Sequence, residues 1–188
     1  MNLVIFGPPG AGKGTQSGYI AKKFRLFQLS TGELLRNEIK NNTNLGKQIS
    51  STINSGNLVS NELVSNLIEK YLSDKTFQNK IIFDGYPRNL IQAQTLNDSM
   101  IKYNQKIHIA LRLTVSLDTI IKRIKERSAL EKRDDDSEEI AIKRYKTYEK
   151  STKPVIEHYK KLNLLKVING ERPIDQINKE ISDIISLI

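Results

Sequence analysis

A short stretch near the N-terminus has the composition of a phosphate-binding loop. Residues 7–15 read GPPGAGKGT and directly follow the apolar run 3–6. Glycines let a chain curl so that successive N–H groups point at phosphate oxygens, and a helix that starts there adds the positive end of its dipole. The usual spacing is G-x-x-x-x-G-K-[ST], whereas here Gly14 separates Lys13 from Thr15. The stretch predicts a nucleotide phosphate site in which Lys13 reaches the outer phosphates.

Two further motifs carry side chains suited to anions. In LSTGELLR, Thr31 and Arg36 lie at the start of a helical pattern that Ser30 or Thr31 can cap. In IIFDGYPRNLIQAQ, Asp84 ends an apolar run, and Arg88 and Gln92 are four residues apart on the next helical stretch. Each motif alone is also typical of an ordinary junction between two structural elements.

The elements that must position these residues alternate along the chain. Short apolar runs predict strands at 3–6, 27–29, 81–83, 107–113 and 164–168. Helical spacing is found at 13–24, 34–40, 45–54, 62–72, 90–100, 117–127, 138–161 and 174–188. Because parallel neighbours need a crossover that is usually a helix, this order predicts an α/β fold with a parallel sheet. Between residues 31 and 59 the pattern contains helices but no strand, which indicates a helical insertion.

Composition narrows the class of protein. The net charge of +9 favours an anionic partner, but it does not distinguish nucleic acid from phosphorylated small molecules. The chain has no cysteine, and its two histidines, His108 and His158, are far apart, so zinc is not expected and both histidines are predicted to be structural or solvated. We expect a cytoplasmic protein, since neither a secretory signal nor a membrane-spanning run is visible.

Taken together, the motifs resemble those of the adenylate kinases, in the wider nucleoside monophosphate kinase family. The matching stretches run from the first strand to the last helix: GPPGAGKGTQ, QLSTGELLR, GNLVSNELV, DGYPRNLIQAQ, RIKER, RDDDSEEIAIKR and VINGERPIDQI. The resemblance implies a P-loop nucleoside triphosphate hydrolase-like fold with a five-stranded sheet. It also implies reversible transfer of a phosphoryl group from ATP to AMP, giving two ADP.

The resemblance assigns residues to two nucleotide sites. Those implied to bind ATP are Gly10, Ala11, Gly12, Lys13, Gly14, Thr15, Arg123, Arg127 and Arg172. Those implied to bind AMP are Thr31, Arg36, Asn57, Leu58, Val59, Gly85, Tyr86, Pro87, Arg88, Gln92, Arg133 and Arg144. Gln92 would read the adenine edge. By analogy alone, the Tyr86–Pro87 bond is expected to be cis.

The chemistry of phosphoryl transfer explains the many arginines. The protein must bring donor and acceptor oxygens into line and neutralise charge, and a guanidinium binds two phosphate oxygens at once. The residues implied to act in the transfer are Lys13, Arg88, Arg123, Arg133 and Arg144. Mg²⁺ would accompany ATP, with Asp84 holding water of its shell and Thr15 nearby.

The charged stretch RSALEKRDDD, residues 127–136, has no periodicity and on its own is typical of a solvated surface. In the family this place carries a lid over ATP, and the chain resembles the short-lid form. The expected organisation is one domain with a core of 1–29, 60–127 and 135–188, an NMP-binding insertion of 30–59 and a lid of 128–134. Asp135 and Asp136 are expected to cap the next helix and to pair with arginines.

Two alternatives remain open. A kinase for UMP or CMP would share nearly every phosphate contact, although Thr31 and Gln92 favour adenine. A nucleic-acid-binding P-loop protein would use the basic charge, but aromatic residues do not alternate with basic ones as a stacking surface requires. We expect a monomer that binds ATP, AMP and ADP, without nucleic acid or membrane partners.

Overall fold

The five predicted strands pair in parallel and form one sheet in the order β2-β3-β1-β4-β5. The structure is a computed structural model that describes residues 1–131 and 136–188. The strands are β1 (Asn2–Phe6), β2 (Phe27–Ser30), β3 (Ile81–Asp84), β4 (Ile107–Thr114) and β5 (Leu165–Asn169). Because all strands run the same way, their carboxyl ends meet at one edge, where the phosphate loop and Asp84 lie. The predicted α/β fold of the P-loop type is confirmed.

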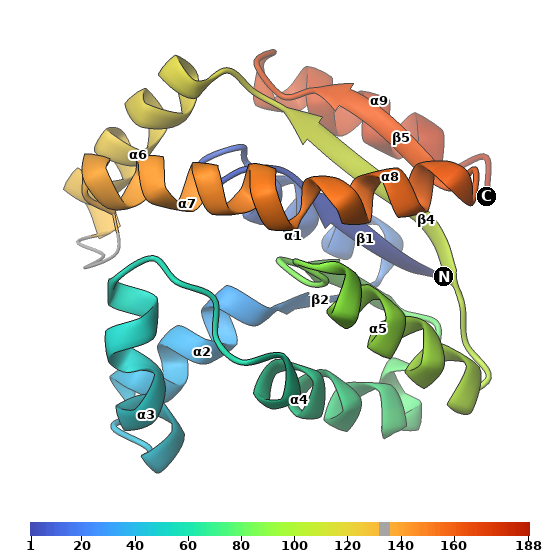
Figure 1. Ribbon diagram of the computed structural model, residues 1–188. Helices are drawn as coiled ribbons and strands as arrows, with labels where there is room; N and C mark the ends of the chain where they lie inside the picture. The colour runs from blue at the N-terminus through green and yellow to red at the C-terminus, as the bar shows by residue number, and fades with distance from the viewer. Residues whose placement is uncertain (132–135) are drawn as a thin grey trace.

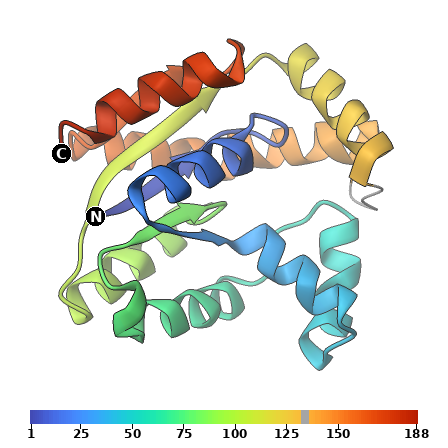
Figure 2. The ribbon, with the colours of Figure 1, turned by 180° about the vertical axis from the view of Figure 1, so that it is seen from behind.

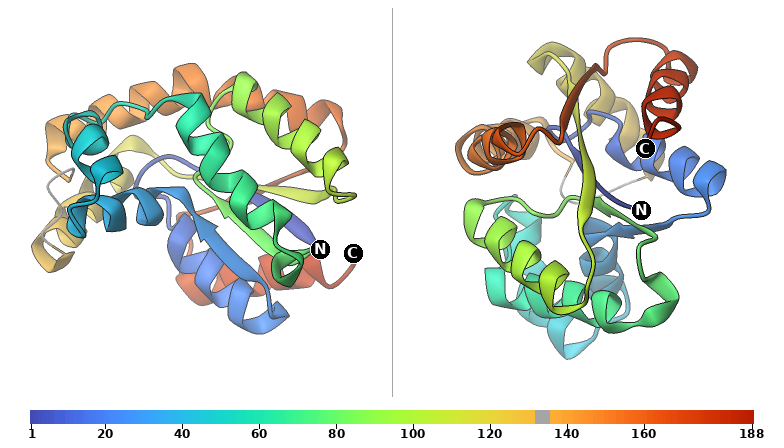
Figure 3. Two further views of the ribbon diagram at one scale, coloured as in Figure 1. Left: turned by 90° about the horizontal axis from the view of Figure 1, so that it is seen from below. Right: turned by 90° about the vertical axis from the view of Figure 1, so that its right-hand side faces the viewer.

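Helices cover both faces of this sheet (Figures 1 and 2). Strand β1 is buried throughout: Val4 and Phe6 belong to one apolar cluster, and Leu3 and Ile5 to a second. The first cluster is closed by α4 (Asn61–Ser73), α5 (Leu90–Lys102) and α8 (Lys153–Lys161), and the second by α1 (Lys13–Phe24) and α9 (Ile174–Ile185). Figure 3 shows the two groups of helices on opposite sides of the sheet. The inner strands β1 and β3 are fully buried and β4 has no exposed residue, which explains why these strands are continuous apolar runs; the edge strands β2 and β5 are less buried.

The helices predicted between residues 31 and 59 are also present, as α2 (Thr31–Lys40) and α3 (Asn44–Asn54). The Ser30 side chain accepts a hydrogen bond from the Glu33 N–H, which starts α2 three residues earlier than the apolar pattern indicated. The two helices pack so closely that a Cβ atom on Gly46 of α3 would lie only 2.1 Å from the Glu38 carbonyl oxygen of α2. Glycine at position 46 therefore allows this contact. Leu35 of α2 anchors the pair to the first apolar cluster.

The prediction of one helix over 138–161 is wrong. The structure has α7 (Glu138–Ser151) and α8, with a break at Thr152. Pro154 lies in the first turn of α8, where its missing N–H costs nothing, but it cannot continue the hydrogen bonds of α7. The Thr152 hydroxyl donates to the Arg88 carbonyl oxygen at 3.0 Å, which ties the break to the loop after β3.

Helix α6 (Leu117–Glu131) is four residues longer than the predicted 117–127, and a short 3-10 turn, η1 (Lys75–Phe77), precedes β3. The other elements match their predictions to within three residues at each end. Among the described residues, no helix is both long and apolar enough to cross a membrane.

Candidate active site

The loop between β1 and α1 is shaped for an anion. Gly10 and Gly12 have φ angles of 76° and 88°, in the left-handed region that favours glycine. A Cβ atom on Gly10 would also lie 3.2 Å from the Ile120 carbonyl oxygen, so a side chain at this position would crowd α6. The Ala11 N–H donates to the Pro8 carbonyl oxygen at 3.1 Å, which closes the turn. The first residues of α1, whose N–H groups have no partner within a helix, line a pocket together with this loop, which is the usual place for an anion.

Lys13 bridges this loop from within. Its Nζ donates to the carbonyl oxygens of Gly7, at 2.8 Å, and Pro8, at 3.0 Å. Burial lowers the pKa of Lys13 to about 8; Asp84 opposes this shift, while nearby arginines, Arg88 foremost, add to it. A cation that is desolvated and surrounded by further cations indicates a place built to receive negative charge.

Two pockets open beside Lys13. The first, here called the Gln92 pocket, lies between the helical insertion and residues 85–92. The second, the Thr15 pocket, lies between the phosphate loop, α6 and Arg172. The cationic side chains that line both pockets are Lys13, Arg36, Arg88 and Arg144. Two ligands bound in these pockets would meet at this set of positive charges.

The predicted site residues are distributed between the pockets as two groups. The Thr15 pocket is lined by all nine residues assigned to ATP: Gly10, Ala11, Gly12, Lys13, Gly14, Thr15, Arg123, Arg127 and Arg172. The Gln92 pocket is lined by eleven of the twelve assigned to AMP: Thr31, Arg36, Asn57, Leu58, Val59, Gly85, Tyr86, Pro87, Arg88, Gln92 and Arg144. The twelfth, Arg133, lies outside the described residues.

The strand-to-helix turn after β3 forms the floor of the Gln92 pocket. Gly85 has a φ angle of 80°, and its carbonyl oxygen accepts hydrogen bonds from Arg88 Nε, at 2.7 Å, and from the Thr31 hydroxyl, at 2.9 Å. The Tyr86–Pro87 peptide bond is cis, as the family resemblance implied. These contacts place the Arg88 guanidinium beside α2, which carries Arg36.

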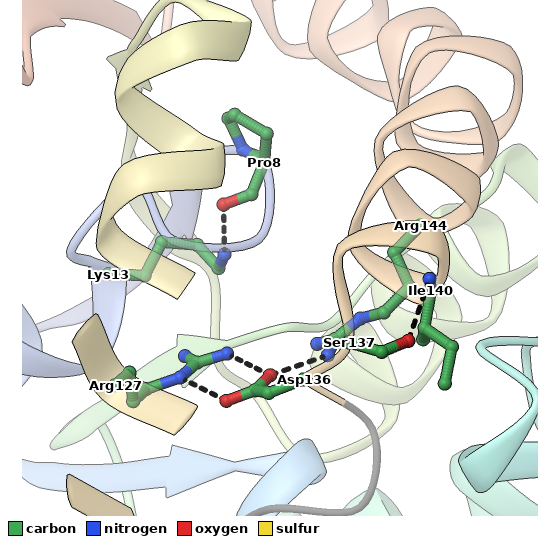
Figure 4. A network of polar contacts seen from close by, with 7 residues as sticks. All are labelled: Pro8, Lys13, Arg127, Asp136, Ser137, Ile140 and Arg144. Carbon is green, nitrogen blue, oxygen red and sulfur yellow. Dashed lines mark hydrogen bonds and ion pairs between the residues drawn. The ribbon is translucent and has the colours of Figure 1, made fainter. Parts of the chain in front are cut away.

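One buried carboxylate joins α6 to α7. Asp136 accepts two hydrogen bonds from the Arg127 guanidinium, at 2.7 and 2.6 Å, and its Oδ1 lies 3.6 Å from Arg144 Nη1 (Figure 4). The Asp136 side chain is fully buried. Its predicted pairing with arginines is therefore present. Its predicted role as a helix cap is wrong, because the Ser137 hydroxyl accepts the Ile140 N–H and caps α7.

Part of the predicted lid cannot be compared with the structure. Arg133, Asp134 and Asp135 lie outside the described residues. Residues 128–131 continue α6, and Leu130 lines the Thr15 pocket.

Asp84 offers oxygen ligands at the Thr15 pocket. The residue is 7% exposed, and its Oδ2 accepts a hydrogen bond from Gln28 Nε2 at 3.4 Å. The Thr15 hydroxyl lines the same pocket. A carboxylate and a hydroxyl are hard donors that suit Mg²⁺, which keeps much of its water shell. The donor set therefore fits a hydrated magnesium ion. Among residues 1–131 and 136–188, no three His, Cys, Asp or Glu side chains cluster as a metal site.

Sequence reasoning missed the polar residues behind Gln92. The Gln92 Oε1 accepts the Arg88 N–H at 2.8 Å, and its Nε2 donates to Asn61 Oδ1 at 3.1 Å. The buried Tyr86 hydroxyl donates to the Gln92 carbonyl oxygen at 3.2 Å. Asn61 is the first residue of α4, which the Ser60 side chain caps by accepting the Leu63 N–H. No local pattern indicates that Asn61 contacts a residue 31 positions later.

Comparison with known proteins gives a consistent result. The profile of the family described as Adenylate kinase matches residues 5–164. The adenylate kinase of Pelagibacter ubique is 43% identical, with 100% of each chain covered. That of Prochlorococcus marinus strain MIT 9515 is 44% identical over 96% of each chain. That of Petrotoga mobilis is 35% identical over 98% of this chain and 97% of the relative.

These relatives differ in length. The alignment with the Pelagibacter ubique enzyme has 213 positions and covers all 188 residues of this chain, so about 25 positions of that relative have no counterpart here (213 minus 188). The alignment with the Prochlorococcus marinus enzyme has 181 positions at equal coverage of both chains, so these two are nearly the same length.

The family match and the geometry point to the same chemistry. The profile includes the phosphate loop, every residue that lines the Gln92 pocket, and the lining of the Thr15 pocket except Arg172, Ile174 and Ile177. The general activity of adenylate kinases is phosphoryl transfer between ATP and AMP, and the family generally uses Mg-ATP. This chain belongs to the adenylate kinase family and is a phosphotransferase.

Proposed function

We propose that ATP binds in the Thr15 pocket, that AMP binds in the Gln92 pocket, and that the phosphoryl group passes directly between them. The observation that carries this assignment is the junction of the two pockets at Lys13, Arg36, Arg88 and Arg144. Most of the phosphate loop, residues 10–12, 14 and 15, lines only the Thr15 pocket, whereas Gly7 lines only the Gln92 pocket and Pro9 and Lys13 line both. A triphosphate held by the loop would therefore point its outer phosphate at the junction.

The transfer needs no covalent intermediate. The AMP phosphate is already an anionic nucleophile, so the protein has only to align the oxygens and to neutralise charge on the equatorial ones. Lys13, Arg88, Arg123 and Arg144 are the cations that we assign to this task, with Arg133 added on the family resemblance. Mg²⁺, bound through water to Asp84 with Thr15 nearby, would supply further neutralisation of the ATP phosphates.

We assign residues 30–59 to an NMP-binding insertion and 128–134 to a short lid on a core of 1–29, 60–127 and 135–188. The insertion supplies Thr31 and Arg36 to the Gln92 pocket, and the end of α6 borders the Thr15 pocket. The Prochlorococcus marinus relative has nearly the same length as this chain, which supports the assignment of a short lid. A lid here would exclude water, which is the competing acceptor.

We further propose a monomer in the cytoplasm, as is typical of adenylate kinases, that binds no nucleic acid. The basic side chains that line the pockets account for part of the +9 charge without a second anionic partner. Size-exclusion chromatography with light scattering would give a mass near 21.5 kDa. A dimer at micromolar concentration would contradict this part of the assignment.

The choice of AMP as acceptor is tested with three monophosphates side by side. With Mg-ATP, we expect ADP formation from AMP to exceed that from UMP or CMP by at least about 100-fold in kcat/KM, because a mismatched base leaves buried polar groups unpaired. Arg88→Ala should abolish transfer to every acceptor, whereas Lys22→Ala, an exposed lysine on α1, should leave it unchanged. Comparable turnover of a pyrimidine monophosphate would contradict the assignment.

A further inference from the structure

Asn61 lies directly behind Gln92, outside the lining of the Gln92 pocket. It is the first residue of α4, which packs beside α5, where Gln92 lies (Figure 1). Gln92 is 2% exposed, and both ends of its side-chain amide have partners in the protein. Its Oε1 accepts the Arg88 N–H at 2.8 Å, and its Nε2 donates to Asn61 Oδ1 at 3.1 Å.

Two backbone N–H groups fix the direction of these hydrogen bonds. A backbone N–H can only donate, so the Arg88 N–H requires the oxygen of the Gln92 amide to face it. The Gln92 N–H likewise requires the oxygen of Asn89, at 2.9 Å, which turns Asn89 Nδ2 toward Asn61 Oδ1 at 2.8 Å. Asn61 Oδ1 thus accepts from both amides. Rotation of the Gln92 amide by 180° would set donor against donor and acceptor against acceptor at the same positions.

The locked amide leaves a defined pattern for a ligand. An amide oxygen has two lone pairs and an amide nitrogen has two hydrogens, so Gln92 keeps one acceptor and one donor for the pocket. A 6-amino purine offers an amine donor next to a ring nitrogen acceptor, which complements this pair. A 6-oxo purine of the same size offers a carbonyl acceptor next to a ring N–H donor, which is the reverse order. Its carbonyl would then face the Gln92 acceptor, and its ring N–H would face the Gln92 donor.

We propose that Asn61 is a specificity-determining positioning residue, which holds the Gln92 amide in the one orientation that accepts a 6-amino purine monophosphate and rejects a 6-oxo purine monophosphate. The proposal rests on the proposed function, since it takes AMP to bind in the Gln92 pocket. Asn61 acts through Gln92 and does not touch the nucleotide. Without its oxygen, Gln92 Nε2 loses its partner, and only the Arg88 N–H still opposes the turned amide that would accept a 6-oxo purine.

The test compares phosphoryl transfer from Mg-ATP to AMP and to IMP. These two nucleotides differ only in the order of hydrogen-bond donor and acceptor on one edge of the base. Asn61→Leu removes the acceptor oxygen at similar volume, and Asn61→Ala removes it with less bulk in case the leucine variant does not fold. Asn61→Asp keeps an oxygen that accepts from both Gln92 and Asn89. Asn66→Leu is the matched control, because Asn66 is exposed on the same helix.

We expect the ratio of kcat/KM for AMP to that for IMP to fall at least about tenfold in Asn61→Leu and Asn61→Ala, as unpaired polar groups account for much of such discrimination. The KM for AMP should rise while kcat at saturating AMP changes less than about threefold. Asn61→Asp and Asn66→Leu should keep the wild-type ratio. An unchanged AMP-to-IMP ratio in both Asn61→Leu and Asn61→Ala would overturn the proposal. So would an Asn61→Asp variant whose ratio falls as far as theirs. Loss of the proposed function itself would be distinct, because the wild-type protein would then fail to phosphorylate AMP.

Discussion

The Asp136 carboxylate accepts both hydrogen bonds of the Arg127 fork and lies 3.6 Å from Arg144, so one buried negative charge orients two cations that line the Thr15 pocket. Arg127 comes from α6 and Arg144 from α7. Figure 4 also shows Lys13, whose Nζ donates to the Pro8 carbonyl oxygen of the phosphate loop. The closed, bidentate geometry is the strongest form of such a contact.

Asp136→Asn should therefore weaken both stability and transfer. The amide of asparagine keeps the size of the side chain but loses its negative charge and one hydrogen-bond acceptor. The positive charges of Arg127 and Arg144 are then no longer neutralised by a buried carboxylate. We expect a loss of about 1 to 3 kcal/mol in the free energy of unfolding and a fall in kcat of at least about tenfold. Urea unfolding and initial rates measure the two effects. Asp98→Asn, an exposed aspartate on α5, should match the wild type, and a fully active, fully stable Asp136→Asn protein would refute the role.

Lys13 should cost the free protein stability at neutral pH. Its pKa in the fold is about 8, against an ordinary value of 10.5, so between these pH values the unfolded chain binds more protons and stability rises with pH. Lys13→Met should remove this dependence. It should make the nucleotide-free protein more stable by about 1 to 3 kcal/mol at pH 7, although the variant is inactive.

The measurement is urea unfolding of both proteins at several pH values from 7 to 10.5. The difference between Lys13→Met and the wild type should be largest at pH 7 and should shrink above about pH 8, as the ammonium of the folded wild type loses its proton. A difference that stays constant over this range would mean that burial does not depress the pKa of Lys13.

Two glycines should respond in opposite ways to alanine. A Cβ atom on Gly46 would meet the Glu38 backbone at 2.1 Å, so Gly46→Ala must push α3 away from α2, with a cost of about 1 to 3 kcal/mol. Gly18 is in the interior of α1 with its nearest neighbour at 3.7 Å, so Gly18→Ala should stabilise by up to about 1 kcal/mol.

Thermal melts of the two glycine variants check the stability changes, and the KM for AMP locates the effect. Because α2 carries Thr31, which lines the Gln92 pocket alone, Gly46→Ala should raise the KM for AMP several-fold and change the KM for ATP much less. An equal rise in both constants would mean that the insertion does not serve one nucleotide alone.

The parallel sheet was predictable because its inner strands β1, β3 and β4 are covered on both faces and so appear as short apolar runs between helical patterns. The phosphate loop was predictable because its glycines and Lys13 follow β1 directly. In contrast, the break between α7 and α8 was not, since Pro154 in a first helical turn leaves the apolar spacing intact and the Thr152 bond to Arg88 is a tertiary contact.

The same reason applies to the polar residues of the site. Asp136 belongs to a charged run that is typical of a surface, and it is buried only because Arg127 and Arg144 approach from two helices. Asn61 reads as a residue at a helix start, and its contact with Gln92 depends on how α4 packs against α5. The arginines were assigned through family resemblance, because a basic chain offers many exposed lysines with the same local appearance.

The central claim, that two nucleotide pockets meet at one set of cations, is tested most directly by incubating the protein with Mg²⁺ and ADP alone and separating the nucleotides over time. We predict that ADP is converted to equal amounts of ATP and AMP, and that Lys13→Ala slows this conversion at least about 100-fold, with Lys22→Ala unchanged. Persistence of ADP in the presence of folded wild-type protein, or its conversion to AMP and inorganic phosphate without ATP, would contradict the claim.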